Sequence, residues 1–329
     1  MSGDLQPIQS VPAHLTSQLP AAIAELGEDA AKSFLEFFVA EIRNANTRAA
    51  YFRAVRRFLE WLDHREVDLR AVEPMHVAAF VEALGRPGAK TAEKGYGVAT
   101  VKQHLAAIRM LFSFLVVRQV LPRNPALDVR GPKHVVRKGK TPHLQKEDAR
   151  QLFESIDPAT PIGVRDQALL GVMVYSFARI GAVLAMDIDD YYQAGRRMLL
   201  RLQEKGGRQH EMPAHHTLVE YLDAYLERLG ESEGPLFRSI NRTRSGFTER
   251  RLDRREALAM VKRRCKAAGL GEKFSNHTFR ATGITAYLEN GGQLEHAQTM
   301  AAHSSPSTTR LYDRTSDDVT LDEVERIIL

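Results

Sequence analysis

The apolar positions in the first third of the chain recur every three or four residues, which predicts amphipathic helices. The first helix would bury one face made of Phe34, Phe37, Phe38 and Ile42. Thr47 can cap a second helix, whose apolar stripe is Tyr51, Val55, Phe58, Leu59 and Leu62. Further helices are predicted over about 73–84 and from about Thr100 to Val120, separated by a loop rich in glycine and lysine.

The second half of the chain combines the helical spacing of three or four residues with the two-residue alternation of strands. Helices are predicted over about 145–155 and over the apolar segment 163–176. Short strand-like segments follow at 186–192, 197–203 and 208–213, the last two joined by a turn at Lys205-Gly206-Gly207. Everything after about 215 is expected to be helical.

These elements predict a mainly α protein of two domains. The first would be all-helical, and the second an α+β domain with a small antiparallel sheet. The expected divisions are a loosely ordered N-terminus at 1–27, a helical domain at 28–128, a basic linker at 129–143 and a second domain at 144–329, whose last residues, 319–329, form a tail helix.

Composition narrows the class of protein. The length of 329 residues suggests about two domains. A single cysteine, Cys265, excludes an internal disulfide framework and a cysteine-based zinc site. We find neither a signal-peptide pattern nor an apolar run of the roughly 18 residues that a membrane span requires, so we expect a cytoplasmic protein without membrane contact. Neighbouring His215 and His216 follow a strand and should point in opposite directions, so no metal site is predicted.

The net charge of +5 becomes informative once it is located. Segment 131–140 holds basic residues without an acid, and segment 237–266 holds eleven Lys and Arg against three acids. Such stretches suit a DNA backbone, although a solvated helix face explains them equally well. The candidate DNA-binding residues are Arg48, Arg53, Arg56, Arg57, Lys102, Arg109, Lys138, Lys140, Arg244, Arg250 and Arg251.

The segment SNHTFRATGITAYLENGG at 275–292 places a histidine and an arginine on one helix face. His277 and Arg280 are three residues apart near the predicted N-terminus, where free backbone N–H groups favour an anion. Taken alone, a capping histidine and a surface arginine are the simpler interpretation. Further along, His303 precedes Tyr312 by nine residues, and core packing would explain each of them separately.

Three segments together resemble the tyrosine recombinase (lambda-integrase-type) family, in particular its two-domain, Xer-like members. They are SFARIGAVLAMDIDD at 176–190, HTFR at 277–280 and AAHSSPSTTRLYDR at 301–314. The family order of Arg, Lys, His-x-x-Arg, His and Tyr is matched by Arg179, Lys205, His277, Arg280, His303 and Tyr312. The resemblance spans about 30–329, and implies a SAM-like fold for the helical N-terminal domain.

The resemblance implies a transesterification of a DNA phosphodiester that uses no metal, ATP or other cofactor. Tyr312 would attack phosphorus and form a 3′-phosphotyrosyl link. Arg179 and Arg280 would offset charge on the phosphate oxygens. Lys205 would protonate the leaving 5′-oxygen, and His277 would act as general base in a role shared with His303. His303 would also hydrogen-bond the phosphate.

Three residues depart from the family pattern close to the first arginine and the last histidine. Phe177 and Ala302 stand where the family commonly has glycine. Ala182 replaces an acid that would partner Arg179. None of the three removes a reacting group, but the positioning of Arg179 depends on them.

The resemblance also implies partners. Two domains would clamp double-stranded DNA, four copies would assemble on two DNA sites, and the tail 319–329 would dock on a neighbouring subunit or, alternatively, on its own domain. Two alternative functions are compatible with this resemblance: a catalytically impaired DNA-binding protein of the same fold, and a relaxase similar to type IB topoisomerases.

Overall fold

The computed structural model of this chain describes residues 23, 28–87, 95–133, 139, 141–204 and 207–313. Several predicted features lie outside these ranges: Lys138, Lys140, Lys205, nearly all of the N-terminal segment 1–27, and the tail 319–329.

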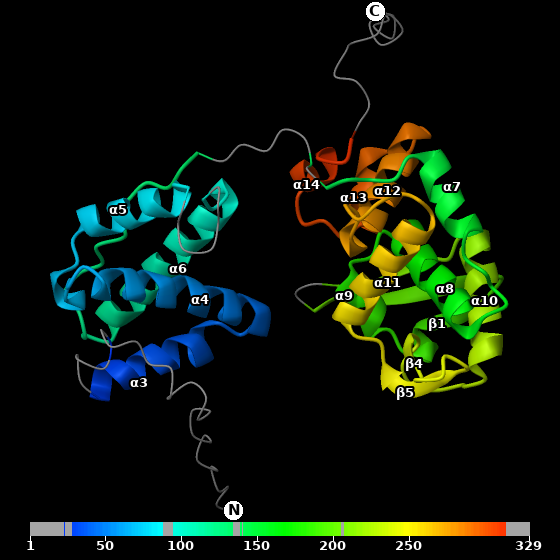
Figure 1. Cartoon of the computed structure of the whole chain (residues 1–329), viewed down its shortest axis with the longest axis horizontal. Helices are drawn as coiled ribbons and strands as arrows, with labels where there is room; N and C mark the ends of the chain where they lie inside the picture. Colours follow the sequence, from blue (N-terminus) through cyan, green and yellow to red (C-terminus); the bar gives the residue numbers. More distant parts are fainter. Residues whose placement is uncertain are drawn as a thin grey trace, which may run out of the picture. The chain divides into compact units, whose positions relative to one another are not determined.

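The chain divides into two compact units, Met1–Val135 and Val136–Leu329 (Figure 1). The division falls between residues 129 and 143, where a linker is predicted. Because residues 134–138 and 140 lie outside the described ranges, the extent of that linker stays a prediction.

The described elements of the first unit are all helical (Figure 1). They are α3 (Glu28–Glu36), a π-helical turn (Phe37–Glu41), α4 (Ala45–Asp63), a 3-10 turn (Leu69–Ala71), α5 (Pro74–Gly85) and α6 (Val98–Val117). The cap of α4 differs from the prediction. Asn44, and not Thr47, is the N-cap, because its side chain accepts hydrogen bonds from the backbone N–H groups of Asn46 and Thr47.

The core of the first unit follows the predicted apolar stripes. Phe34, Phe37, Phe38 and Ile42 are all buried, as their spacing predicted. The phenylalanine rings pack edge to face, with the Phe37 and Phe38 centroids 4.7 Å apart. Helices α4 and α6 pack against each other and bury Val55, Phe58, Leu59 and Leu62, whereas the predicted Tyr51 is only partly buried.

Helix α6 corrects the expectation that no apolar segment is long enough for a membrane span. By length and composition alone it could cross a membrane. Half of its most apolar window is buried, however, and Ile108, Leu111, Phe112 and Leu115 are all fully buried. Because a helix that is apolar on most faces suits a protein interior as well as a lipid bilayer, α6 is explained as the central core helix of this unit.

The second unit contains most of the helices and both described sheets. Its helices are α7 (Lys146–Glu154), α8 (Pro161–Tyr175), α9 (Ile180–Ala185), α10 (His216–Leu229), α11 (Arg254–Ala267), α12 (Asn276–Glu289), α13 (Leu294–Met300) and α14 (Pro306–Arg310). Its strands are β1 (Tyr191–Ala194), β2 (Arg197–Glu204), β3 (Arg208–Pro213), β4 (Arg238–Ile240) and β5 (Phe247–Arg251).

Strands β1, β2 and β3 form the predicted small antiparallel sheet in sequential order. Leu200 pairs with Tyr191 on one side and with Met212 on the other. The first strand begins later than predicted. The segment Ile188–Asp190 is a 3-10 turn, because the side chains of Asp187 and Asp190 bond each other's backbone N–H groups and compete with strand pairing.

The hairpin of β4 and β5 contradicts the expectation that only helices follow residue 215. Its second strand is rich in polar residues and lacks a clear apolar alternation. Tertiary contacts stabilise it instead. Arg251 donates to the carbonyl oxygens of Leu184 and Met186 and pairs with Asp187 at 2.5 Å.

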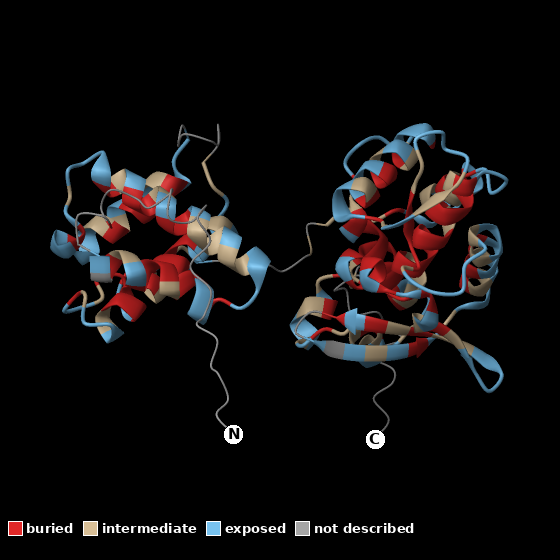
Figure 2. Ribbon diagram, turned by 90° about the horizontal axis from the view of Figure 1, so that it is seen from below, coloured by how far each residue is buried: buried red, intermediate tan, exposed pale blue. Residues whose placement is uncertain are grey.

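Helix α8 packs against α10 and α12 near the middle of the second unit, where buried residues gather between the helices (Figures 1 and 2). Its contact with α12 is unusually close at Gly283. A Cβ atom there would lie 2.0 Å from the carbonyl oxygen of Val174 and 2.9 Å from the ring of Phe177. The glycine therefore sets the distance between α12, which carries Arg280, and the C-terminal end of α8, which precedes Arg179 in the chain.

We predict that Gly283→Ala lowers the free energy of unfolding by about 1–3 kcal/mol, because the added methyl group must push backbone atoms apart. Urea denaturation followed by circular dichroism measures this change. Gly181→Ala is the matched control, since Gly181 in α9 has no atom within 4 Å of an added Cβ. Its stability should be unchanged or higher by up to about 1 kcal/mol. Equal losses in both variants would contradict the close-contact explanation.

Candidate active site

Five of the six residues predicted from the family order gather in the second unit. Arg179 is the N-cap of α9. His277 and Arg280 lie on the first turns of α12, His303 follows α13, and Tyr312 follows α14. The sixth, Lys205, lies outside the described residues.

Tyr312 and His277 are in direct contact. The phenol oxygen of Tyr312 lies 3.0 Å from Nε2 of His277. The tyrosine is 6% exposed, and the hydroxyl of Thr285 donates to its backbone carbonyl at 3.2 Å. The tyrosine hydroxyl is therefore held within proton-transfer distance of an imidazole nitrogen.

His303 also lies next to the ring of Tyr312. Its ring is nearly parallel to that of Tyr312, with an interplanar angle of 10° and centroids 5.9 Å apart. Its Nδ1 is 2.9 Å from the hydroxyl of Thr309, and the side-chain amide of Gln298 donates to its backbone carbonyl. Because Thr309 occupies Nδ1, Nε2 is the nitrogen that remains for a substrate. The sequence reading missed Thr309, whose only signal is its place one helical turn before Tyr312.

Arg280 is the most buried charged group of the cluster, with 1% of its surface exposed. One Nη group donates to the carbonyl oxygen of Phe177, and the other to that of Ala301 at 2.5 Å. Its Nε is buried without a hydrogen-bond partner among the described residues. The guanidinium therefore ties together the two backbone turns that lead into Arg179 and His303.

Both of these turns contain a strained residue at a position where the family commonly has glycine. Phe177 has a φ of 56° and Ala302 a φ of 46°, in the left-handed region that costs a residue with a Cβ about 1–2 kcal/mol. Both turns therefore adopt a left-handed conformation without a glycine. The ring of Phe177 is buried and packs edge to face on Tyr287, which offsets part of the strain.

Arg179 has an acidic partner that sequence reasoning did not find. Glu204, the last residue of β2, lies 2.5 Å from Nη1 of Arg179 and also accepts its backbone N–H at 3.4 Å. Glu204 is 4.0 Å from the guanidinium of Arg280 as well. Its position immediately before Lys205 is the one signal that could have identified it. Ala182 is buried in the core and supplies no charge.

Burial and the two arginines keep both histidines of the cluster neutral. Burial lowers the pKa of His303 to about 3, and repulsion from Arg280 and Arg179 adds to this effect. The pKa of His277 also lies below its ordinary 6.5, first because neighbouring atoms exclude water and then because the same arginines repel a positive charge. Neutral His277 can therefore accept a proton from Tyr312 at pH 7.

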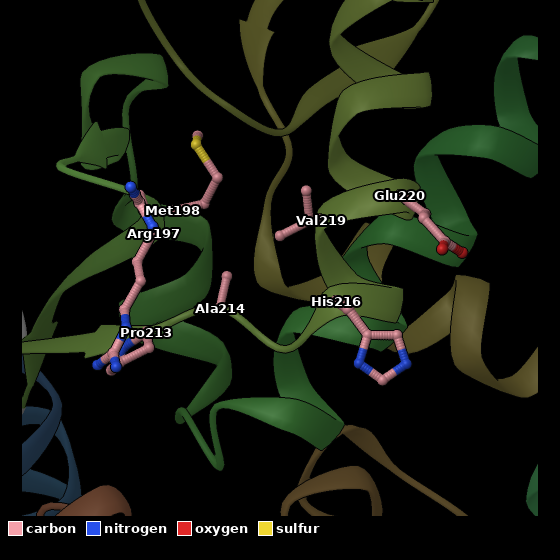
Figure 3. Close-up of a pocket in the computed structure, with 8 residues that line it drawn as sticks. Arg197, Met198, Pro213, Ala214, His216, Val219 and Glu220 are labelled. Carbon is pink, nitrogen blue, oxygen red and sulfur yellow. The ribbon is translucent and has the colours of Figure 1, made fainter.

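Two other features of the second unit lie outside this cluster. A surface pocket lined by Arg197, Met198, Pro213 and His216 lies at the start of β2, the opposite end of the strand from Glu204 (Figure 3).

No group of three or more potential metal ligands occurs among the described residues. The rings of His215 and His216 lie side by side with centroids 4.1 Å apart, contrary to prediction, because His215 caps α10 and its neighbour is already helical.

The candidate DNA-binding arginines of the first unit differ in what else they contact. Arg109 donates to the carbonyl oxygens of Ala126 and Val129, so its guanidinium holds the chain after α6. Arg48 donates to the carbonyl oxygen of Ile42, Arg56 pairs with Glu60, and Arg57 stacks over the ring of Tyr96. Arg53, Arg56 and Lys102 are exposed, and of these three Arg56 pairs with an acid.

In the second unit, two candidate DNA-binding arginines also serve the fold. Arg250 pairs with Glu256 at 2.7 Å, and Arg251 holds the β4–β5 hairpin against the backbone before β1. Arg244 is exposed in the turn between β4 and β5. A count of basic residues in this segment therefore overstates the charge that is left for a partner.

Comparison with known families agrees with this geometry. Residues 142–318, more than half of the chain, match the Phage integrase family, and residues 31–119 match the Phage integrase, N-terminal SAM-like domain. The tyrosine recombinase XerD of Listeria monocytogenes serotype 4b (strain F2365) is 26% identical over 292 residues, covering 86% of this chain and 93% of that protein.

Solved structures show the same fold. The XerH site-specific recombinase bound to its difH substrate in a pre-cleavage complex has a TM-score of 0.63 at 16% identity, covering 99% of this chain and 98% of that one. A lambda integrase tetramer bound to a Holliday junction has a TM-score of 0.64 at 17% identity, covering 88% of this chain and 80% of that one. The fold, the matched segments and the residue order lead to one conclusion: this chain belongs to the phage integrase family of tyrosine recombinases.

Proposed function

We propose that this recombinase cuts and rejoins DNA at specific sites, with Tyr312 as the nucleophile. The observation that carries the proposal is the 3.0 Å contact between the Tyr312 hydroxyl and Nε2 of His277. The contact lies in a cluster that also holds His303 and two arginines, and Tyr312 itself helps to keep Arg280 charged. This arrangement suits attack on a phosphodiester, whose developing negative charge needs cationic donors.

In the proposed reaction one ester bond is exchanged for another. The Tyr312 oxygen attacks phosphorus while its proton passes to Nε2 of His277, and the bond from phosphorus to the 5′-oxygen breaks. Lys205 gives a proton to that oxygen. The products are a 3′-phosphotyrosyl link and a free 5′-hydroxyl. A 5′-hydroxyl from another strand then reverses the step. The phosphotyrosyl ester conserves the energy of the broken phosphodiester bond, so the reaction requires neither ATP nor a metal.

The remaining groups of the cluster would stabilise the transition state. Arg179 is half-buried and faces the cluster from α9, so its guanidinium can donate to a non-bridging phosphate oxygen. The buried Arg280 would add its positive charge to that of Arg179 near the phosphate. Nε2 of His303, opposite the nitrogen bound to Thr309, would hydrogen-bond the same phosphate.

We further propose double-stranded DNA as the substrate and a tetramer as the active assembly. The family supports DNA as substrate, and the exposed Arg53, Lys102 and Arg244 are positive groups available for its backbone. The tetramer rests on the fold shared with the lambda integrase complex. The tail 319–329, with its apolar Leu321, Val324 and Ile328, would dock on a neighbouring copy. A cytoplasmic location follows from this substrate.

We predict that Tyr312→Phe abolishes covalent trapping of a nicked suicide duplex that carries the cognate site, because the phenyl ring lacks the attacking oxygen. Denaturing gel electrophoresis measures the adduct. The control is Tyr192→Phe, since Tyr192 lies on strand β1 and should leave trapping intact. Wild-type protein that binds the site but forms no adduct would instead support the DNA-binding alternative, and relaxation of supercoiled DNA without strand exchange would support the topoisomerase-like one.

Acid should slow cleavage only below the pH at which an ordinary histidine titrates. His277 is active as a base when neutral, and its pKa is lowered from 6.5, so the rate should stay constant from about pH 8 to 6.5 and fall at lower pH. Single-turnover cleavage rates across this range test the prediction. In His277→Asn the rate should be lower and this acid limb should be absent. A wild-type rate that already declines above pH 7 would exclude neutral His277 as the base.

Exposed and internally bonded basic residues of the first unit should contribute differently to the salt dependence of DNA binding. Arg53→Ala and Lys102→Ala should each reduce the slope of log Kd against log salt by about 0.9, as expected when one phosphate contact is lost. Arg109→Ala should leave the slope unchanged but lower the stability of the unit, because its guanidinium bonds two carbonyl oxygens. Fluorescence anisotropy with a duplex of arbitrary sequence measures the slopes. Equal slopes in all three variants would refute the assignment.

A further inference from the structure

One buried carboxylate lies between the two arginines of the site. The side chain of Glu204 is 3% exposed, 2.5 Å from Nη1 of Arg179 and 4.0 Å from Nη1 of Arg280. It also accepts the backbone N–H of Arg179. A carboxylate that contacts both the backbone and the guanidinium of one residue fixes the position and the direction of that side chain.

The family pattern places an acid elsewhere, three residues after the first arginine. In this chain that position is Ala182, which is buried on α9. Helix α9 packs against β2, so either element can present a carboxylate to Arg179. We propose that Glu204 is a positioning residue for the recombination reaction, because it supplies from β2 the carboxylate that α9 lacks. This inference rests on the proposed function.

The charge of Glu204 matters in addition to its hydrogen bonds. Arg179 and Arg280 repel each other, and this repulsion contributes, after burial, to lowering the pKa of Arg280 to about 10. Glu204 acts in the opposite direction and favours the charged guanidinium. The carboxylate therefore allows two cations to be held side by side before a phosphate arrives.

Loss of this charge should separate DNA binding from cleavage. Without the carboxylate the site carries more net positive charge, so its attraction for a DNA phosphate is at least as strong as before. Arg179, however, would lose the partner that orients it toward the reacting phosphorus. A purely structural role for Glu204 predicts a different result, because partial unfolding would weaken binding and cleavage together.

The first experiment measures both quantities in Glu204→Gln, which keeps the size of the side chain. We expect single-turnover cleavage of a suicide duplex to slow by about 10- to 100-fold, the usual effect of a misplaced reacting group. The Kd for the same duplex should stay unchanged or fall. Cleavage at the wild-type rate, or a parallel loss of binding and cleavage, would overturn the proposal.

The second experiment returns the carboxylate to the family position. Ala182→Glu, introduced into the Glu204→Gln variant, should raise the cleavage rate by about tenfold, because Arg179 regains an acidic partner. A folded double variant that cleaves no faster than Glu204→Gln would overturn the proposal. The matched control is Glu211→Gln on β3, which removes an exposed carboxylate paired with Arg201 and should leave cleavage unchanged.

Two further comparisons keep the outcomes distinct. If Glu204→Gln does not fold, Glu204→Asp replaces it, since aspartate keeps the charge but withdraws it by one methylene. We then expect slower cleavage at unchanged Kd, and a wild-type rate would overturn the proposal. Failure of the proposed function has another signature, because wild-type protein itself would then form no covalent adduct.

Discussion

The site depends on the buried guanidinium of Arg280. It bonds the carbonyl oxygens of Phe177 and Ala301, and so joins two turns that are more than a hundred residues apart in sequence. One turn leads into Arg179, and the other into His303. Both contain a residue in the left-handed region without the freedom of glycine. Burying a guanidinium is costly unless its donors are satisfied, so these bonds stabilise the arginine and the strained turns together.

Burial, reinforced by the same positive charge, sets the protonation of the neighbouring histidines. Burial lowers the pKa of both imidazoles and repulsion from Arg280 and Arg179 adds to this effect, so His277 and His303 are both neutral near pH 7. In the proposed reaction, one cluster would therefore combine cations for the phosphate with a neutral base for the tyrosine. Glu204 balances part of the charge, and this explains how two guanidiniums are held within one small region of the fold.

The basic surface shows why the number of arginines is a poor measure of DNA contact. Several of the candidates contribute to the fold. Arg109 bonds two carbonyl oxygens, Arg250 pairs with Glu256, and Arg251 anchors a hairpin. Exposed Arg53 and Lys102 have the same charge but no comparable internal role. A guanidinium has five donors, and those used inside the protein constrain its direction, so only the structure separates the two groups.

Local sequence determined much of this protein. Apolar spacing predicted the helices and their buried faces, because a helix must bury one stripe whatever its neighbours are. The order of Arg179, His277, Arg280, His303 and Tyr312 predicted the cluster only through its resemblance to the tyrosine recombinase pattern, because capping or core packing explains these residues when each is taken separately. Tertiary structure alone decided the rest. The β4–β5 hairpin, the acid on β2 in place of one at position 182, and the carbonyl partners of Arg280 all arise from contacts between distant segments, which no local pattern records.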